Sequence, residues 1–298
     1  MKHAVRTLFL TPFLTLAFLL VTFAAPLTAN AASANSHSHI MGIKHANSIQ
    51  QPSSTNNLTY HGGQVMAGTA NVYAIFWEPT GSTVSANYNS LIKRYFGDVG
   101  SSGLYHNNSQ YTQTGGGFSN NAVLAGSWVD TASYPGNTLQ DSQIQGEVTH
   151  AQQVNHWTSS IDNIFFVFTA KNENICSGGS CSFTTFCAYH GFFGSHTIYA
   201  AMPYTGTNLS ACGVSTSPNG DFNADSTINV TSHEQIEAAT DPLLNAWYDR
   251  SGSEIGDKCA WNFGPTNSHG GDVTWNGHTY EVQKEWDNHI SGCALSGP

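Results

Sequence analysis

The sequence contains few charged residues, and basic ones are especially scarce. Charged side chains make up 9% of the 298 residues, with 19 acidic against 9 basic, which gives a formal net charge of −10 at pH 7. An acidic surface repels phosphate groups, so we expect no binding to nucleic acid or to anionic membranes.

Several motifs that identify common folds and enzyme classes are also missing. No two cysteines have the CxxC spacing of a zinc ribbon, and no GxSxG segment marks the nucleophile of an α/β-hydrolase. No internal repeat is visible. Beyond the N-terminal region, no stretch approaches the roughly 18 apolar residues that span a membrane. These absences exclude the thiol-ligated zinc folds, the serine hydrolases of that type and the repeat architectures.

The N-terminus has the three parts of a secretory signal. Lys2 and Arg6 precede an apolar run over residues 8–25, and residues 29–31 have the small-x-small pattern after which signal peptidase cleaves. Prolines break the run, which favours a cleaved signal over a membrane anchor. We therefore predict a signal peptide over residues 1–31 and a secreted protein, extracellular or in the cell wall, with no membrane partner.

The remaining chain divides into a polar segment and one domain. Residues 32–59 are rich in Ser, Asn, His and Gln and contain few large apolar groups, so they cannot bury enough surface to fold alone. We predict a disordered linker or pro-segment there. Residues 60–298 are numerous enough for a single domain with a substantial core.

The cysteines indicate disulfides. Their number is even and all lie in the second half of the chain, as expected for an exported protein in an oxidising compartment. Sequence alone does not choose among the possible pairings; we expect one bond near the C-terminus and local pairing of the others. The expected C-terminal bond joins Cys259 to Cys293, and the other four are Cys176, Cys181, Cys187 and Cys212.

The hydrophobic pattern predicts alternating strands and helices. Runs of β-branched and aromatic residues indicate buried strands, and apolar residues at a spacing of three to four indicate helices. We predict an α/β fold with a mixed, mainly parallel sheet flanked by helices, zincin-like, with a disulfide-rich C-terminal half. Expected strands are 71–78, 122–129, 163–170 and 197–202, expected helices are 84–96, 138–157 and 228–240, and a Cys- and Gly-rich insert occupies 172–195.

The segment around His233 has the HExxE spacing of a metal-dependent peptidase. Residues i and i+4 share a helical face, so His233 and Glu237 could hold one divalent ion while Glu234 faces a water molecule. The alternative is a solvated helix on which His233 and Glu237 merely pair. We expect Asp225 or Ser226 to cap the helix and Pro242 to end it.

A catalytic zinc takes three protein ligands and keeps an open position, so a third ligand must come from elsewhere. We predict Asp257, with Glu254 and then His190 as alternates. A charged turn around Gly256 is the competing interpretation of the two carboxylates. Asp241 lies eight residues from His233, about 12 Å along a helix, and is expected to support the ligands or brace the helix end.

The predicted chemistry is peptide hydrolysis. Glu234 would be the general base, and Tyr248, or a histidine such as His190, would donate a hydrogen bond to the oxyanion. The expected cofactor is Zn²⁺, and the oxygen-rich ligand set also suits Mn²⁺ or Ca²⁺.

Four segments resemble the phosphate-induced protein 1 (EXORDIUM-like) family. They are YHGGQVM at 60–66, NVYAIFW at 71–77, FCAYHG at 186–191 and the long segment 217–249, and VQKEW at 282–286 adds to them. The resemblance implies a secreted, cell-wall or extracellular protein linked in plants to growth signalling. Plant members generally lack the His233-Glu234 pair and carry Asn-Pro where this chain has Asp241-Pro242, so we interpret it as a microbial relative with a metal-peptidase-like core.

Two functional hypotheses remain. One is a secreted metallopeptidase that acts on a peptide or protein substrate. The other is a non-catalytic extracellular protein that binds a cell-wall polymer or a receptor and holds a structural metal or none. Glu234 separates them, because only catalysis requires its carboxylate.

Overall fold

The computed structural model describes residue 1, residues 38–42 and residues 56–298. Every element below lies in the unit Asn35–Pro298. The signal peptide predicted for residues 1–31 falls outside the described residues, apart from Met1. Within the predicted linker or pro-segment, Ser38–Gly42 forms a strand. The assignment of residues 32–59 otherwise stays a prediction.

A six-stranded sheet forms the centre of the domain, with the strand order β1-β9-β10-β6-β3-β4. The strands β10, β6, β3 and β4 pair in parallel, whereas β9 pairs antiparallel with both β10 and β1. The sheet is therefore mixed, as predicted, and it is antiparallel at the end formed by β1 and β9. The strands are β1 (Ser38–Gly42), β3 (Ala70–Trp77), β4 (Ala122–Asp130), β6 (Asn163–Thr169), β9 (Phe186–Phe193) and β10 (Thr197–Met202).

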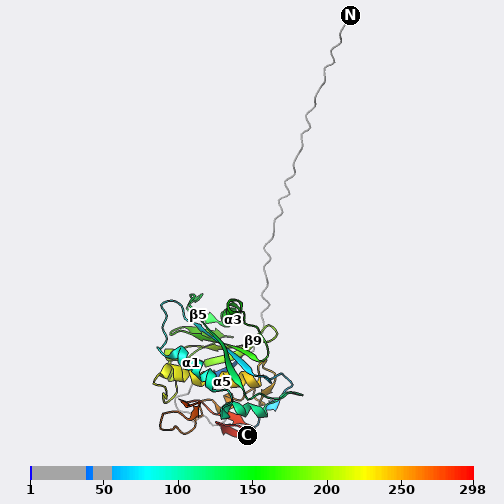
Figure 1. Ribbon diagram of the computed structural model, residues 1–298, viewed down its shortest axis with the longest axis vertical. Coiled ribbons are helices and arrows are strands. Elements are labelled where there is room, and N and C mark those ends of the chain that lie inside the picture. The colour runs from blue at the N-terminus through cyan, green and yellow to red at the C-terminus, as the bar shows by residue number, and fades with distance from the viewer. Residues whose placement is uncertain (2–37, 43–55) are drawn as a thin grey trace. The chain divides into compact units, whose positions relative to one another are not determined.

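Helices cover both faces of this sheet (Figure 1). Helices α1 (Tyr88–Asp98) and α5 (Phe222–Thr240) pack on one face, and α3 (Asp141–Asn155) packs on the other. Because side chains alternate along a strand, β3 serves both cores: Phe76 belongs to the cluster on the α1 and α5 side, and Ile75 to the cluster on the α3 side. This arrangement places α5 beneath β9 and β10.

Short elements and loops complete the domain. Two of them matter for the site: η3 (Asp257–Cys259), which follows α5, and β14 (Glu285–Asp287), which pairs with β15 (Gly292–Ala294). The others are β2 (Thr59–Tyr60), α2 (Gly103–His106), η1 (Asn107–Gln110), β5 (Thr138–Gln140), β7 (Asn174–Ser177), β8 (Ser180–Cys181), η2 (Thr205–Thr207), α4 (Leu209–Cys212), β11 (Trp247–Tyr248), β12 (Val273–Trp275) and β13 (His278–Tyr280).

Three disulfides confirm the cysteine prediction. Cys259 bonds to Cys293 as expected, and the remaining bonds are the local pairs Cys176–Cys181 and Cys187–Cys212. None of the helices in the described part of the chain has the length and apolar character of a membrane-spanning helix.

All three predicted helices have different starting points in the structure. The predicted helix 84–96 begins four residues later, as α1 at Tyr88. The predicted helix 138–157 is wrong in its first three residues, which pair with β7 as strand β5; α3 then starts with a capping box between Gln140 and Gln143. The predicted helix 228–240 begins six residues earlier, at Phe222. Its cap is Asp221, whose carboxylate accepts hydrogen bonds from the Asn223 and Ala224 amides, and not Asp225 or Ser226.

Candidate metal centre

Helix α5 supplies the first group of site residues. Its residues from Ala224 to Thr240 are buried, which is unusual for a helix rich in polar side chains. One helical turn brings His233 Nε2 to 3.0 Å from Glu237 Oε1, as the i, i+4 spacing requires. The HExxE face is therefore an interior face, and the alternative of a solvated helix is wrong.

The loop after α5 brings two more carboxylates to this face. Asp257 Oδ1 lies 3.8 Å from His233 Nε2, and the Asp257 amide donates a hydrogen bond of 2.9 Å to Glu237 Oε1. The Glu254 amide in turn donates to Asp257 Oδ2 at 3.2 Å. The bond from Cys259 to Cys293 ties η3 to β15 and so constrains the loop that carries Asp257.

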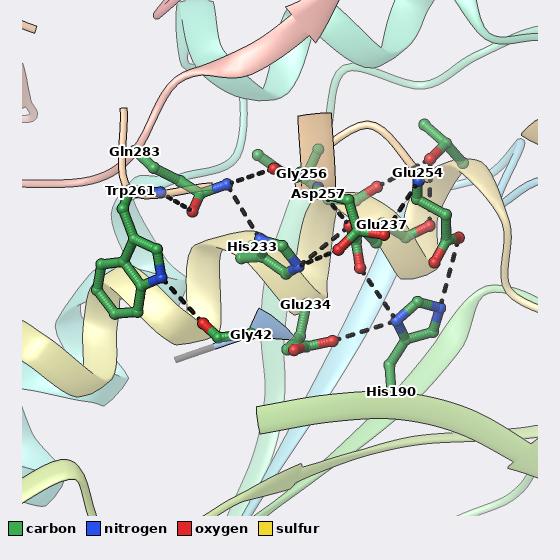
Figure 2. Close-up of polar contacts among 12 residues, drawn as sticks. Gly42, His190, His233, Glu234, Glu237, Glu254, Gly256, Asp257, Trp261 and Gln283 are labelled. Carbon is green, nitrogen blue, oxygen red and sulfur yellow. Dashed lines mark hydrogen bonds and ion pairs between the residues drawn. The ribbon is translucent and has the colours of Figure 1, made fainter. Parts of the chain in front are cut away.

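Strand β9 adds His190 from the other side (Figure 2). Its Nδ1 lies 3.2 Å from Glu234 Oε2 and 3.6 Å from Glu237 Oε2, and its Nε2 lies 3.8 Å from Glu254 Oε1. Two sets of possible metal ligands result, and Glu237 belongs to both. One set is His233, Glu237 and Asp257, and the other is His190, Glu237 and Glu254.

The structure thus brings together five predicted ligands and alternates, but not Tyr248. Tyr248 lies on β11, where its ring stacks on His61 with 3.6 Å between the ring centroids. It is not among the side chains gathered around Glu237. Asp241 braces the end of α5, as expected, because its Oδ1 accepts hydrogen bonds of 2.6 Å from the amides of Asn245 and Ala246.

Sequence reasoning missed the residues that hold His233 in place. Gln283 Nε2 lies 3.0 Å from His233 Nδ1 and donates a hydrogen bond of 2.9 Å to Gly256 O. A Cβ at Gly256 would lie 2.7 Å from His233 Nδ1, so only glycine allows the loop to approach this closely. Gln283 lies in the segment VQKEW, which the family resemblance had singled out without a role.

Buried acidic side chains are the feature of the centre that would suit a cation. Glu234, Glu237, Glu254 and Glu285 are all completely buried. Burial raises the pKa of Glu234 to about 8 and raises the pKa of Glu285 well above its usual value. Carboxylates in a low-dielectric interior either take up protons or are balanced by a cation. This donor set, which joins imidazole nitrogens to several carboxylate oxygens, fits a divalent cation.

A separate buried acid lies on the other face of the sheet. Glu147 on α3 is close to Asp130, and His150 Nδ1 lies 3.5 Å from Asp130 Oδ2 and 3.7 Å from Glu147 Oε2. Burial, with a further contribution from the Asp130 carboxylate, raises the pKa of Glu147 from 4.5 to about 8. Between pH 4.5 and about 8, the folded chain therefore keeps a proton on Glu147 that the unfolded chain has released.

Glu147 is expected to make the free energy of unfolding fall as pH rises from about 4.5 to 8, because the folded state binds the extra proton. Replacing Glu147 with glutamine removes this dependence, which contributes less than about 1.4 kcal/mol per pH unit. Urea unfolding of both chains between pH 5 and 8 measures it. The free energies of unfolding of Glu147→Gln and the parent should diverge toward pH 8, and parallel curves would contradict the assignment.

Comparison with known proteins supports the family resemblance. The phosphate-induced protein 1 conserved region matches residues 58–293. Protein EXORDIUM-like 5 of Arabidopsis thaliana is 25% identical over 291 residues, covering 81% of this chain and 78% of that protein. Protein EXORDIUM-like 3 of Arabidopsis thaliana is 24% identical over 293 residues, covering 81% of this chain and 83% of that protein.

No solved structure matches the chain significantly. The match to the conserved region begins before β3, ends at Cys293 and includes all residues of the candidate metal centre. Since it extends over most of the sequence, the chain belongs to the phosphate-induced protein 1 family.

Proposed function

We propose that the chain is a secreted, metal-dependent peptidase of the HExxE type. One observation carries the proposal: His233, Glu237 and Asp257 converge in a buried acidic site, and Glu234 lies beside them on α5. A general base next to a set of metal ligands is the arrangement that peptide hydrolysis by an activated water requires.

His233, Glu237 and Asp257 would hold the ion, and His190 and Glu254 lie on the other side of Glu237. We expect Zn²⁺, and the predominance of oxygen ligands also suits Mn²⁺ or Ca²⁺. When bound, the ion would act as a Lewis acid and lower the pKa of a water molecule.

Side chains of the protein carry out the proton transfer and the stabilisation of charge. Glu234 takes a proton from the attacking water, whose oxygen bonds to the carbonyl carbon, and returns the proton to the amine nitrogen as the C–N bond breaks. His190 Nδ1, 3.2 Å from Glu234 Oε2, orients that carboxylate and is placed to stabilise developing negative charge. It takes the role first predicted for Tyr248.

The fold is consistent with a zincin-like design. In this proposal the helix with the metal ligands, α5, packs under β9 and β10 of a mixed sheet, and β9 runs antiparallel to both of its neighbours beside the metal centre. The three disulfides support an extracellular location, because such bonds persist in oxidising compartments. The substrates would then be extracellular peptides or proteins.

Hydrolysis of a mixed-sequence peptide library tests the proposal. We would assay the zinc-loaded full chain and the same chain cut at a protease site inserted within residues 43–55, because β1 lies opposite His190 on β9. The expected result is cleavage that a chelator abolishes and added Zn²⁺ restores. No cleavage by either form, with the metal bound, would contradict it and favour a non-catalytic extracellular protein that binds a cell-wall polymer or a receptor.

A further inference from the structure

Strand β1 occupies the outer edge of β9, directly beside the metal centre. It runs antiparallel to β9, and the register places His39 opposite His190 and Met41 opposite Ala188. The other edge of β9 is already paired with β10. Without β1, the backbone of β9 would present an open edge that can accept another extended chain. The conserved region of the family begins at residue 58, so β1 is not part of it.

Away from β9, strand β1 contacts α5 and Trp261. Strand β1 packs on α5, which carries Glu234. Trp261 Nε1 donates a hydrogen bond of 2.9 Å to Gly42 O, and Figure 2 shows this indole pointing toward Gly42. The segment is therefore held by β9 on one side and by Trp261 on the other.

The side chains of β1 alternate between the two cores. Met41 is completely buried and belongs to the apolar cluster on the α5 side of the sheet, whereas Ile40 packs against the cluster on the α3 side. An extended peptide in this groove therefore buries one side chain in an apolar pocket beside Glu234. A residue of the size and polarity of methionine fits that position.

We propose that the groove between β9 and Trp261 is the peptide-binding cleft of the metal centre and that Ser38–Gly42 is its tethered occupant. This rests on the proposed peptidase function. A substrate must place its leaving amide nitrogen within reach of the general base, and β1 lies opposite His190 on β9 and packs on α5, which carries Glu234. The cleft thus selects extended peptides with a large apolar residue at the position that Met41 occupies. The bound segment keeps such peptides out until it is released.

Binding of a synthetic peptide tests the occupancy. We would label a peptide with the sequence of residues 36–44 and measure its fluorescence anisotropy with the full chain and with Met41→Asp, which places a charge in the apolar pocket. A short tether gives an effective concentration of about 1 mM. The parent should therefore bind the added peptide at least about tenfold more weakly than Met41→Asp does.

Two controls isolate the effect of the groove. Ile290→Asp adds the same charge at an exposed apolar side chain and should bind the peptide as weakly as the parent. The second control is the same peptide with aspartate in place of methionine at position 41. This peptide still contains His37 and His39, and it should not bind to the Met41→Asp protein. Equal affinities of the parent and Met41→Asp, or equal binding of both peptides, would overturn the proposal.

A cleaved form of the parent protein tests the proposal even if Met41→Asp does not fold. Cutting the parent at a protease site within residues 43–55 removes the tether without altering the groove, and the same tenfold gain is expected; no gain overturns the proposal. Anisotropy does not require turnover. Peptide binding without hydrolysis of any peptide would therefore contradict the peptidase and leave the cleft standing, whereas hydrolysis without the tenfold gain would contradict only the cleft.

Discussion

Replacing Glu234 with glutamine is expected to lower kcat for peptide hydrolysis by about 10³-fold while the metal stays bound. Glutamine keeps the shape of the side chain but cannot take a proton from water, and general-base catalysis contributes about 10²–10⁴-fold to such reactions. Glu234 is completely buried beside His190 and follows His233 directly on α5. Steady-state kinetics on a peptide cleaved by the parent, with metal content measured on the same samples, gives the comparison.

Glu147→Gln is the matched control for this substitution. It makes the same chemical change in a buried glutamate, on α3 and on the opposite face of the sheet. Its kcat should equal that of the parent. If Glu234→Gln, loaded with metal, kept more than about a tenth of the parent kcat, Glu234 would not be the general base.

Removing the metal at pH 8 is expected to lower the melting temperature by about 10 °C. Glu234, Glu237 and Glu254 are completely buried around His190, so loss of the cation leaves their charges to repel each other or forces them to take up protons. An ion present at a thousand times its Kd contributes about 4 kcal/mol to the free energy of unfolding, and each kcal/mol shifts the melting temperature by about 2–4 °C in a domain of this size.

Differential scanning calorimetry with and without a chelator measures this shift. His233→Ala serves as the control, because a chain that has lost its metal ligand should show no change on chelation. Adding back Zn²⁺ should restore the melting temperature of the parent and not that of the variant. An unchanged melting temperature in the chelated parent would show that no cation balances the buried carboxylates.

The parts of the site that depend on local sequence could be predicted. The spacing of His233 and Glu237 fixes their common face on any helix, and α5 confirms it. Its true start could not be read from periodicity, because the first turn carries the half-exposed Phe222 and polar neighbours. There the side chain of Asp221, and not an apolar pattern, begins the helix.

The parts that depend on pairing between distant segments could not be predicted. Strand β9 lies in the insert 172–195, where cysteines and glycines hide the strand pattern; its pairing with β10 and β1 makes it a strand. His190 was therefore ranked behind Asp257 and Glu254. Strand β1 comes from a polar segment whose composition predicts disorder. Only the edge of β9 and the contacts beyond it explain its extended structure.

The position of Tyr248 was also beyond local reasoning. Its place six residues before Glu254 suggested a role in the site, but pairing of β11 with β2 puts its ring on His61. Conversely, Gln283 contacts His233 although it lies 50 residues further along the chain. Such contacts are set by the packing of the whole domain, which no motif encodes.

Metal content tests the central claim most directly. Elemental mass spectrometry of the secreted chain, purified without chelators, should find about one divalent ion per chain. His233→Ala and Glu237→Ala, made the same way, should have lost it, since both side chains belong to the proposed ligand set. A parent chain without bound metal, with both variants folded like the parent, would contradict the metal centre and the peptidase proposal built on it.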